Sequence, residues 1–296
     1  SCINEEQFMK ILQNIFRKKI VNFDKVYCSL RKEKFMINEW DITQTNQKNI
    51  NNNKPNVAIL GTSAIEAHNY HLPEGQDFLH TDAIVKRVTK ESWEKTKSVI
   101  CLPTLPYGVD CNLMDFPLTI HVRQSTLDLM ITEIVSSLVH HGIKKIVLIN
   151  GHGGNDFAPL VRQIQSDLDV YMFWCNFYEI KDKNNKIFEK DDDHAGEIET
   201  SIALALFPEL VQLSQANDGA ARPYKFEALE KGWIKTSRKF SRLNDYCGNA
   251  DPSLATAEKG HKYLDFVCNQ ISEFIVQLSE SDVDEYFPHK SGIFNP

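Results

Sequence analysis

The 296-residue chain lacks several features that would exclude or assign whole classes of protein. It has no apolar run that approaches the roughly 20 residues a membrane-spanning helix needs. It also lacks an excess of basic residues, with 33 lysines and arginines against 40 aspartates and glutamates and a formal net charge of −7. A negative balance disfavours nucleic acid and anionic membrane surfaces. We therefore expect neither as a partner.

Paired cysteines and an apolar leader are also missing. The seven cysteines are odd in number and scattered, which fits neither a disulfide framework nor a zinc knuckle. Residues 1–20 carry charged side chains where a signal peptide would have its apolar core. Both features favour a reducing compartment, so we expect a cytoplasmic protein. The chain contains no internal repeat.

Alternating strand and helix patterns are present from Val57 onward. Short apolar runs predict strands at 57–61, 98–103, 144–149 and 170–177. Helical spacing predicts helices at 82–93, 125–140, 155–168, from 194 onward and at 255–278. This alternation is typical of βαβ units, so we predict an α/β fold with a parallel sheet. Residues 211–253 look irregular, with room for a hairpin near 232–234.

Two segments precede this alternation. Apolar side chains recur at helical spacing over residues 8–16, which predicts an amphipathic helix for a core or oligomer contact, with a partner site as the alternative. Residues 46–56 are polar and rich in asparagine, so we expect a mobile loop there.

The stretch 66–77, E-x-H-x-x-H-L-P-x-G-x-D, follows the first predicted strand. Glu66 and His68 are two residues apart, so both point the same way in extended chain. Asp77 lies beyond the turn that Pro73 and Gly75 predict, and a returning loop could bring it back to them. Ligands of open α/β sheets bind beyond the carboxyl ends of the strands. Carboxylate and imidazole together suit zinc, manganese or iron. The alternative is a polar loop with a stray histidine.

Two later turns carry similar residues. The sequence N-G-H-G-G-N at 150–155 follows a predicted strand, and H-A-G-E-x-E-T-S at 194–201 opens a predicted helix. These motifs, with a fourth at 251–260, resemble those of the creatininase (creatinine amidohydrolase) family over roughly residues 55–280. The resemblance implies a single three-layer domain with a mainly parallel central sheet flanked by helices. It would follow an extension and Asn-rich linker at 1–54 and precede a tail at 281–296.

The resemblance also implies two adjacent divalent ions of zinc, manganese or iron. Their expected ligands are Glu66, His68, Asp77 and His152, with Asp77 as the bridging carboxylate. His194 matches the family's catalytic histidine, which we expect to act as general acid/base or oxyanion stabiliser. The acidic run 191–193 could raise its pKa. Family members commonly form homohexamers, so we expect a homo-oligomer.

The chain departs from creatininase proper in one ligand. Creatininase proper resembles N-G-H-x-E-N, whose glutamate binds metal, whereas this chain carries Gly154. It therefore resembles the N-G-H-G-G-N branch and needs another ligand. Glu199 is our candidate. Glu197 is the competitor, although a carboxylate there also suits a helix N-terminus. Leu118 replaces the glycine of the family's F-P-G-T sequence.

Further residues are expected to bind substrate or to support the ligands. These residues are His71, Gly153, Gly154, Asn155 and Tyr107, with simple packing as the alternative for His71. We predict a metal-dependent amidohydrolase that cleaves a non-peptide C–N bond, in a formamide or cyclic amide of a small metabolite, by a metal-bound hydroxide. Creatinine is disfavoured, because Lys190-Asp191 stands where a tryptophan is expected. The alternatives are a peptide-processing hydrolase of the same family and a non-catalytic or regulatory member that acts through partner binding.

Overall fold

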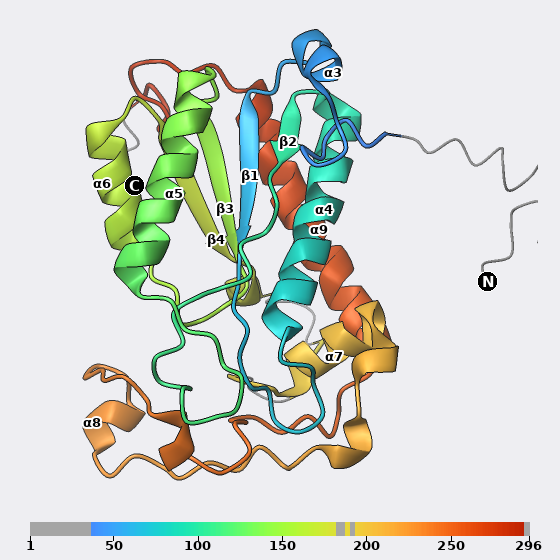
Figure 1. The fold of residues 1–296 in the computed structure, drawn as a ribbon, viewed down its shortest axis with the longest axis vertical. Coiled ribbons are helices and arrows are strands. Elements are labelled where there is room, and N and C mark those ends of the chain that lie inside the picture. The colour runs from blue at the N-terminus through green and yellow to red at the C-terminus, as the bar shows by residue number, and fades with distance from the viewer. Residues whose placement is uncertain (1–36, 182–186, 190–192, 293–296) are drawn as a thin grey trace, which may run out of the picture. The chain divides into compact units, whose positions relative to one another are not determined.

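The computed structural model describes residues 37–181, 187–189 and 193–292 (Figure 1). The chain forms two compact units, Ser1–Asn38 and Glu39–Pro296, and the helices and strands named below belong to the second. The amphipathic helix expected at residues 8–16 lies outside the described residues. No helix of the described chain is both long and apolar enough to cross a bilayer.

A parallel sheet of four strands forms the centre of the described chain, in the order β2-β1-β3-β4. Its strands are β1 (Val57–Thr62), β2 (Val99–Cys101), β3 (Lys145–Asn150) and β4 (Tyr171–Asn176). Every residue of β1 and β3 is buried, as expected for central strands covered on both faces. The predicted α/β fold is confirmed. The apolar run 170–177 also predicts a buried strand, but the edge strand β4 is only partly buried.

Helices cover both faces of this sheet, which gives three layers (Figure 1). One face carries α4 (Gln76–Thr96), α7 (Glu197–Leu206) and α9 (Ala257–Glu280), and the other carries α5 (Gln124–His140) and α6 (Ala158–Asp167). Alternate residues of β1 feed the two cores. Val57 and Ile59 join the core under α4 and α9, whereas Ala58 and Leu60 join the core under α5 and α6.

Helix α4 begins earlier than the sequence pattern predicts. It starts at Gln76 instead of residue 82, so Asp77 lies in its first turn and not on a returning loop. An acidic side chain is favourable there, because the helix N-terminus carries partial positive charge. Asp77 is therefore held by a regular helix of 21 residues.

Part of the Asn-rich segment 46–56, for which the composition predicts a mobile loop, is helical. It forms the short helix α3 (Gln47–Asn52), none of whose residues is buried. The Asn46 side chain caps it by accepting hydrogen bonds from the backbone N–H groups of Lys48 and Asn49. Just before it, Trp40 packs in the core and Asp41 pairs with Cys101 of β2.

Residues 207–256 cross the lower end of the molecule in Figure 1, beneath the carboxyl ends of the strands. They contain η2 (Pro208–Leu210), η3 (Leu213–Gln215), α8 (Glu227–Glu230) and η4 (Phe240–Arg242). All of these residues are described, and none forms a strand, so the expected hairpin is absent. Gly232, with a φ of +74°, instead closes the turn after α8, and Trp233 is 70% exposed.

The fourth motif, at 251–260, joins α9 to α7. Thr256 caps α9 by accepting a hydrogen bond from Lys259 N, and its own N–H donates to Ser201 Oγ at 3.2 Å. Gly260 faces the backbone of α7, because a Cβ there would lie 1.9 Å from Ser201 O. The motif therefore sets the position of α7, the helix that carries Glu197 and Glu199.

Candidate metal centre

The sheet register brings the predicted ligand turns together. Thr62 at the end of β1 pairs with Asn150 at the end of β3, so the segments that follow both strands leave the sheet side by side. The first segment carries Glu66 and His68, and the second carries His152. Helix α4 adds Asp77, and the start of α7 adds His194 and Glu199. All except Glu199 are buried.

Asp77 lies between two groups of possible ligands. Its Oδ2 is 3.0 Å from His152 Nδ1, which is also 3.1 Å from Glu66 Oε1. Its Oδ1 is 3.1 Å from His68 Nε2, which is 3.8 Å from Glu199 Oε2. In each group the ligand atoms lie within 4.8 Å of one another, a spacing at which they could hold a metal ion. One carboxylate thus offers one oxygen to each group.

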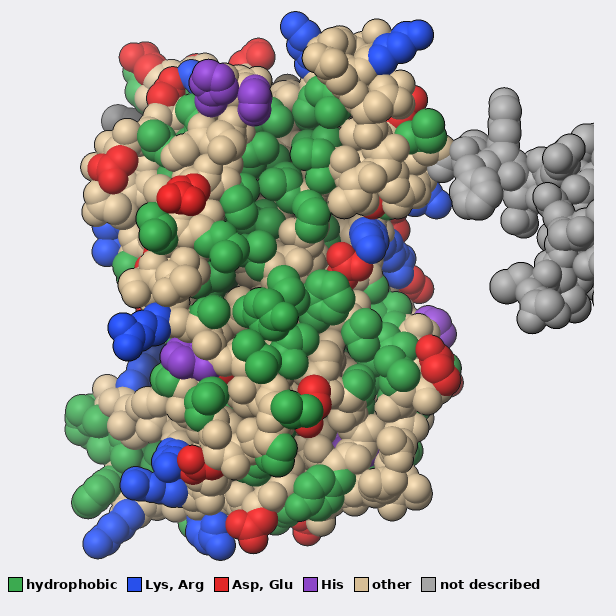
Figure 2. Space-filling view, viewed as in Figure 1, with side chains coloured by type: hydrophobic (Ala, Val, Ile, Leu, Met, Phe, Trp, Pro, Cys, Tyr) green, Lys and Arg blue, Asp and Glu red, His purple; other side chains and the backbone are tan. Residues whose placement is uncertain are grey.

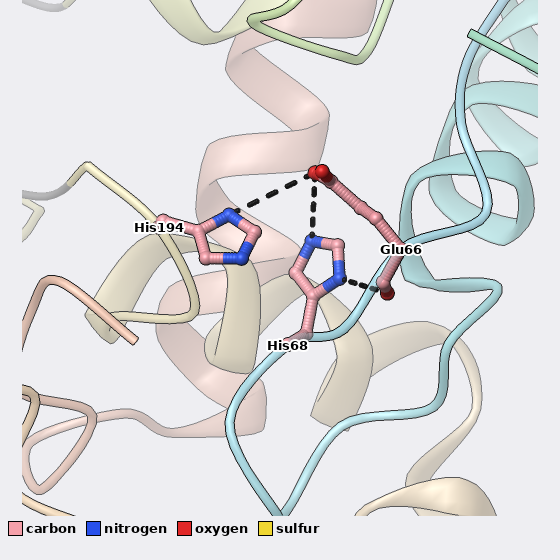
Figure 3. A group of neighbouring side chains, drawn as sticks. All are labelled: Glu66, His68 and His194. Atoms are coloured by element: carbon pink, nitrogen blue, oxygen red, sulfur yellow. Dashed lines mark hydrogen bonds and ion pairs between the residues drawn. The ribbon is translucent and has the colours of Figure 1, made fainter. Parts of the chain in front are cut away.

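A third group joins Glu66, His68 and His194 (Figure 3). His194 Nε2 donates a hydrogen bond to Ala67 O at 2.8 Å, which leaves Nδ1 facing Glu66 Oε1 at 3.8 Å. His68 is held in the same manner: its Nδ1 donates to Glu66 O at 2.9 Å, so Nε2 faces the carboxylates. Backbone carbonyls therefore set the orientation of both rings and the tautomer that each adopts when it is neutral.

The buried carboxylates of the centre give it negative charge that bound cations would balance. Burial raises the pKa of Glu66 to about 7, although His152 opposes the shift. Burial also disfavours protonated His68, but the carboxylates of Asp77 and Glu199 outweigh it and raise the pKa of His68 to about 10. His68 thus offsets part of the carboxylate charge by holding a proton, a role that divalent ions would take over. Glu66 Oε2 and His68 Nε2 are buried without a hydrogen bond to any described residue, so the donor set fits metal ions.

His194 is neutral, contrary to the expectation that the acidic run before it would raise its pKa. Burial and then the positive charge of His68 lower the pKa of His194 to about 3. Asp193 acts in the opposite direction but weakly, because its carboxylate is engaged by Arg238 and Asn249. Residues 191 and 192 lie outside the described residues.

The two candidate glutamates of α7 have different surroundings. Glu199 Oε2 faces His68 and accepts a hydrogen bond from Ala195 N at 2.6 Å. Glu197 is fully buried and forms an ion pair with Lys259 Nζ at 2.5 Å. Its other oxygen accepts a hydrogen bond from Glu189 N. The structure therefore places Glu199 at the centre, whereas Glu197 links α7 to α9.

Two asparagines hold the His152 turn. Asn150 Nδ2 donates to His152 O at 2.7 Å, and Asn150 Oδ1 accepts from Asn155 Nδ2 at 3.1 Å. Asn155 Oδ1 in turn accepts from Val109 N, so Asn155, expected near substrate, fastens the turn to the β2–α5 loop. A Cβ at Gly154 would lie 2.3 Å from Val109 O, which leaves no room for the glutamate of creatininase proper. Gly153 is open, with no described atom within 4 Å of its Cβ position.

Other residues singled out in the sequence lie around the centre. His71 Nε2 lies 2.8 Å from Thr200 Oγ1 of α7, and burial lowers the pKa of His71 to about 4. Tyr107 is 49% exposed on the β2–α5 loop. Among the described residues, Tyr107 makes no hydrogen bond to any of the candidate ligands.

Two residues near His152 were missed by the sequence reasoning. His80 of α4 is buried, and its Nε2 donates to Gly151 O at 3.3 Å. Asp110 is fully buried on the β2–α5 loop, with Oδ1 3.0 Å from His152 Nε2. His80 lies three residues after Asp77 on α4, a spacing that could have drawn attention to it. Asp110 had no such signal, because it lies 42 positions from His152 in a polar loop.

Several known proteins are similar to this chain in sequence. A family model described as creatininase (creatinine amidohydrolase) matches residues 40–275. The creatinine amidohydrolase of Pseudomonas putida is 27% identical over 183 residues, or 55% of this chain and 68% of the relative. The mycofactocin precursor peptide peptidase of Mycolicibacterium smegmatis is 23% identical over 225 residues, or 74% and 84%.

Solved structures support the fold. A candidate creatinine amidohydrolase from Bacteroides fragilis superposes with a TM-score of 0.76 at 30% identity, covering 83% of this chain and 99% of that one. Creatininase structures named for zinc and for manganese reach TM-scores of 0.68 and 0.66 at 22% identity, and at that identity they speak for the fold alone. Together with the family model, these likenesses show that the chain belongs to the creatininase family of hydrolases.

Proposed function

We propose that the chain is a metal-dependent amidohydrolase that cleaves a non-peptide C–N bond. The observation that carries the proposal is the position of Asp77, which offers one oxygen to each of two groups of ligands. Glu66, Asp77 and His152 would hold one divalent ion, and His68, Asp77 and Glu199 would hold the other. Zinc, manganese and iron all accept such oxygen and nitrogen ligands.

The bound ions would supply a water of lowered pKa and would polarise the substrate carbonyl. We assign proton transfer to His194. Its Nε2 proton is engaged by Ala67 O, so Nδ1 offers a lone pair beside Glu66. This free lone pair is the group that would accept a proton during attack on the carbonyl and return it to the leaving nitrogen.

The substrate class that we propose is a formamide or cyclic amide of a small metabolite. A creatinine amidohydrolase among the relatives supports the cyclic amide, although the residues before His194 disfavour creatinine itself. The second candidate is processing of a peptide, because the peptidase from Mycolicibacterium smegmatis matches a larger share of this chain.

A substrate panel tests the proposed function. The purified full chain, loaded in turn with zinc, manganese and iron, is incubated with formamides, lactams and short peptides, and formate, ammonia and free amines are measured. We expect about two ions per chain and release from the formamide or lactam set. Release from peptides alone would favour the second candidate. Full metal loading without any release would favour a non-catalytic protein that acts through partners.

The two glutamates of α7 give a second prediction. Glu199→Gln is expected to lower the affinity for one of two ions by more than about tenfold, because it removes a charged ligand. Glu197→Gln, a matched change two residues away, should leave metal affinity near the parent value and instead lower stability, since it breaks the buried pair with Lys259. Metal titration and urea unfolding measure the two effects. The reverse pattern would make Glu197 the ligand.

We also propose that the chain acts in the cytoplasm as a homo-oligomer, with a small molecule as substrate and with neither nucleic acid nor membrane as partner. Hydrophobic side chains gather in the middle of the face on which the β2–α5 loop lies (Figure 2). The exposed large apolar residues of that loop and of α5 are Tyr107, Met114, Leu118, Ile120, Leu129 and Met130. Apolar area of this kind supports association. The net charge of −7 argues against nucleic acid and membrane as partners, and the scattered cysteines support the cytoplasm as the compartment.

A further inference from the structure

Asp110 is a fully buried carboxylate outside the proposed ligand set. Its backbone N–H donates to His121 Nδ1 at 3.1 Å, and the neighbouring Val109 N–H donates to Asn155 Oδ1 at 3.1 Å. The first bond lies within the β2–α5 loop, and the second holds this loop against the His152 turn. The two carboxylate oxygens make no hydrogen bond of normal geometry within the described chain. A buried carboxylate is costly unless it is paired, so its environment has to provide a partner.

That partner is the far side of His152. Asp110 Oδ1 lies 3.0 Å from His152 Nε2, whereas His152 Nδ1 lies 3.0 Å from Asp77 Oδ2 and 3.1 Å from Glu66 Oε1. A neutral imidazole has one N–H and one lone pair. If Nε2 carries the proton toward Asp110, the lone pair of Nδ1 points at the ligand carboxylates.

The geometry points to Asp110 as a positioning residue that fixes the tautomer of His152 and makes Nδ1 the ligand atom. This inference rests on the proposed metal centre. A carboxylate behind a metal-binding histidine also increases the basicity of the ring and strengthens its bond to the metal. Asp110 would therefore tighten the site formed by Glu66, Asp77 and His152 and would leave the other site unchanged.

The three histidines of the centre differ in the kind of group that orients the imidazole ring. His68 and His194 are oriented by backbone carbonyls, Glu66 O at 2.9 Å and Ala67 O at 2.8 Å. His152 has a carbonyl as well: Val109 O lies 3.3 Å from Nε2 in normal hydrogen-bond geometry, whereas the Asp110 carboxylate lies outside that geometry but is closer, at 3.0 Å, and carries charge. Hydrogen bonds to charged acceptors are about twice as strong as those to neutral ones. The experiment must therefore separate Asp110 from Val109 O.

Calorimetric titration of the metal-free full chain with Co²⁺ or Mn²⁺ separates the contribution of Asp110 to metal affinity from that of Val109 O. We expect two binding steps in the parent. Asp110→Asn, which keeps an acceptor oxygen but loses the charge, should weaken one step about 10- to 100-fold, and Asp110→Ala at least as much, while the other step changes by less than about threefold. Asp115→Asn is the matched control, because Asp115 is exposed on the same loop and pairs with Lys239. It should leave both steps unchanged.

Three results would overturn the inference. Unchanged binding in both Asp110 variants would assign the orienting role to Val109 O. An equal loss in both steps, together with a lower melting temperature of the metal-free protein, would make Asp110 a structural residue of the loop. A parent chain that binds no metal would overturn the proposed function as well, which the first two results would not do.

A measurement on the parent protein does not depend on variant folding. Nitrogen-15 spectra of the zinc-loaded, histidine-labelled chain report which nitrogen of each ring is protonated. The expected form of His152 is protonated at Nε2 and bound to metal through Nδ1. The opposite tautomer would overturn the inference.

Discussion

Asp77→Asn is expected to reduce the metal content of the purified protein from about two ions per chain to less than one, and the hydrolytic rate by more than about a hundredfold. Asp77 is the residue shared by both ligand groups, with one oxygen 3.1 Å from His68 Nε2 and the other 3.0 Å from His152 Nδ1. An amide offers one oxygen and no charge, so it cannot serve two cations as a carboxylate does. Elemental analysis and activity on the best substrate measure both effects.

Glu94→Gln is the control for this change. Glu94 lies on the same helix, α4, but its side chain is 57% exposed and faces Lys90 across the helix surface. It should keep the metal content and rate of the parent. If Asp77→Asn kept one ion at parent affinity, Asp77 would belong to one site only. If it kept both ions, the dinuclear arrangement would be refuted.

Gly260→Val is expected to lower the free energy of unfolding by about 3 kcal/mol or more. The reason is the close contact between α9 and α7, where a Cβ at Gly260 would lie 1.9 Å from Ser201 O and 2.9 Å from the Cβ of Ala205. Because backbone atoms occupy this space, one helix has to move away from the other. Urea unfolding of the metal-free protein measures the loss.

The same substitution should also weaken metal binding, since α7 carries Glu199 near its first turn. Gly292→Ala is the control, because no described atom lies within 4 Å of its Cβ position. Parent stability in Gly260→Val would show that α7 and α9 can separate without cost. Reduced stability with unchanged metal affinity would show that the position of Glu199 does not depend on this contact.

Much of the fold could be predicted because it depends on local patterns. The apolar runs at 57–61 and 144–149 predict the two central strands, β1 and β3, because strands covered on both faces are mostly hydrophobic. Helical spacing predicted α5 to within one residue. The start of α4 was missed, because its first two turns bury the polar residues Gln76, Asp77 and His80 near the site and so lack an apolar pattern. The expected hairpin is absent for a similar reason. Segment 211–253 consists mainly of turns and loops, and such structure leaves no periodic pattern in the sequence.

The candidate ligands were also visible in the sequence, because each lies in a short motif at the end of a predicted element. The sequence alone thus determined the family, the α/β fold and the residue types of the centre. Only the tertiary structure decided how these residues are arranged. It gave Asp77 to both groups, separated Glu199 from Glu197 by pairing the latter with Lys259, and brought Asp110 behind His152. The physical reason is that a ligand site and a buried ion pair are defined by distances between segments remote in the chain, and such distances follow from strand register and helix packing, which no local pattern of residues encodes.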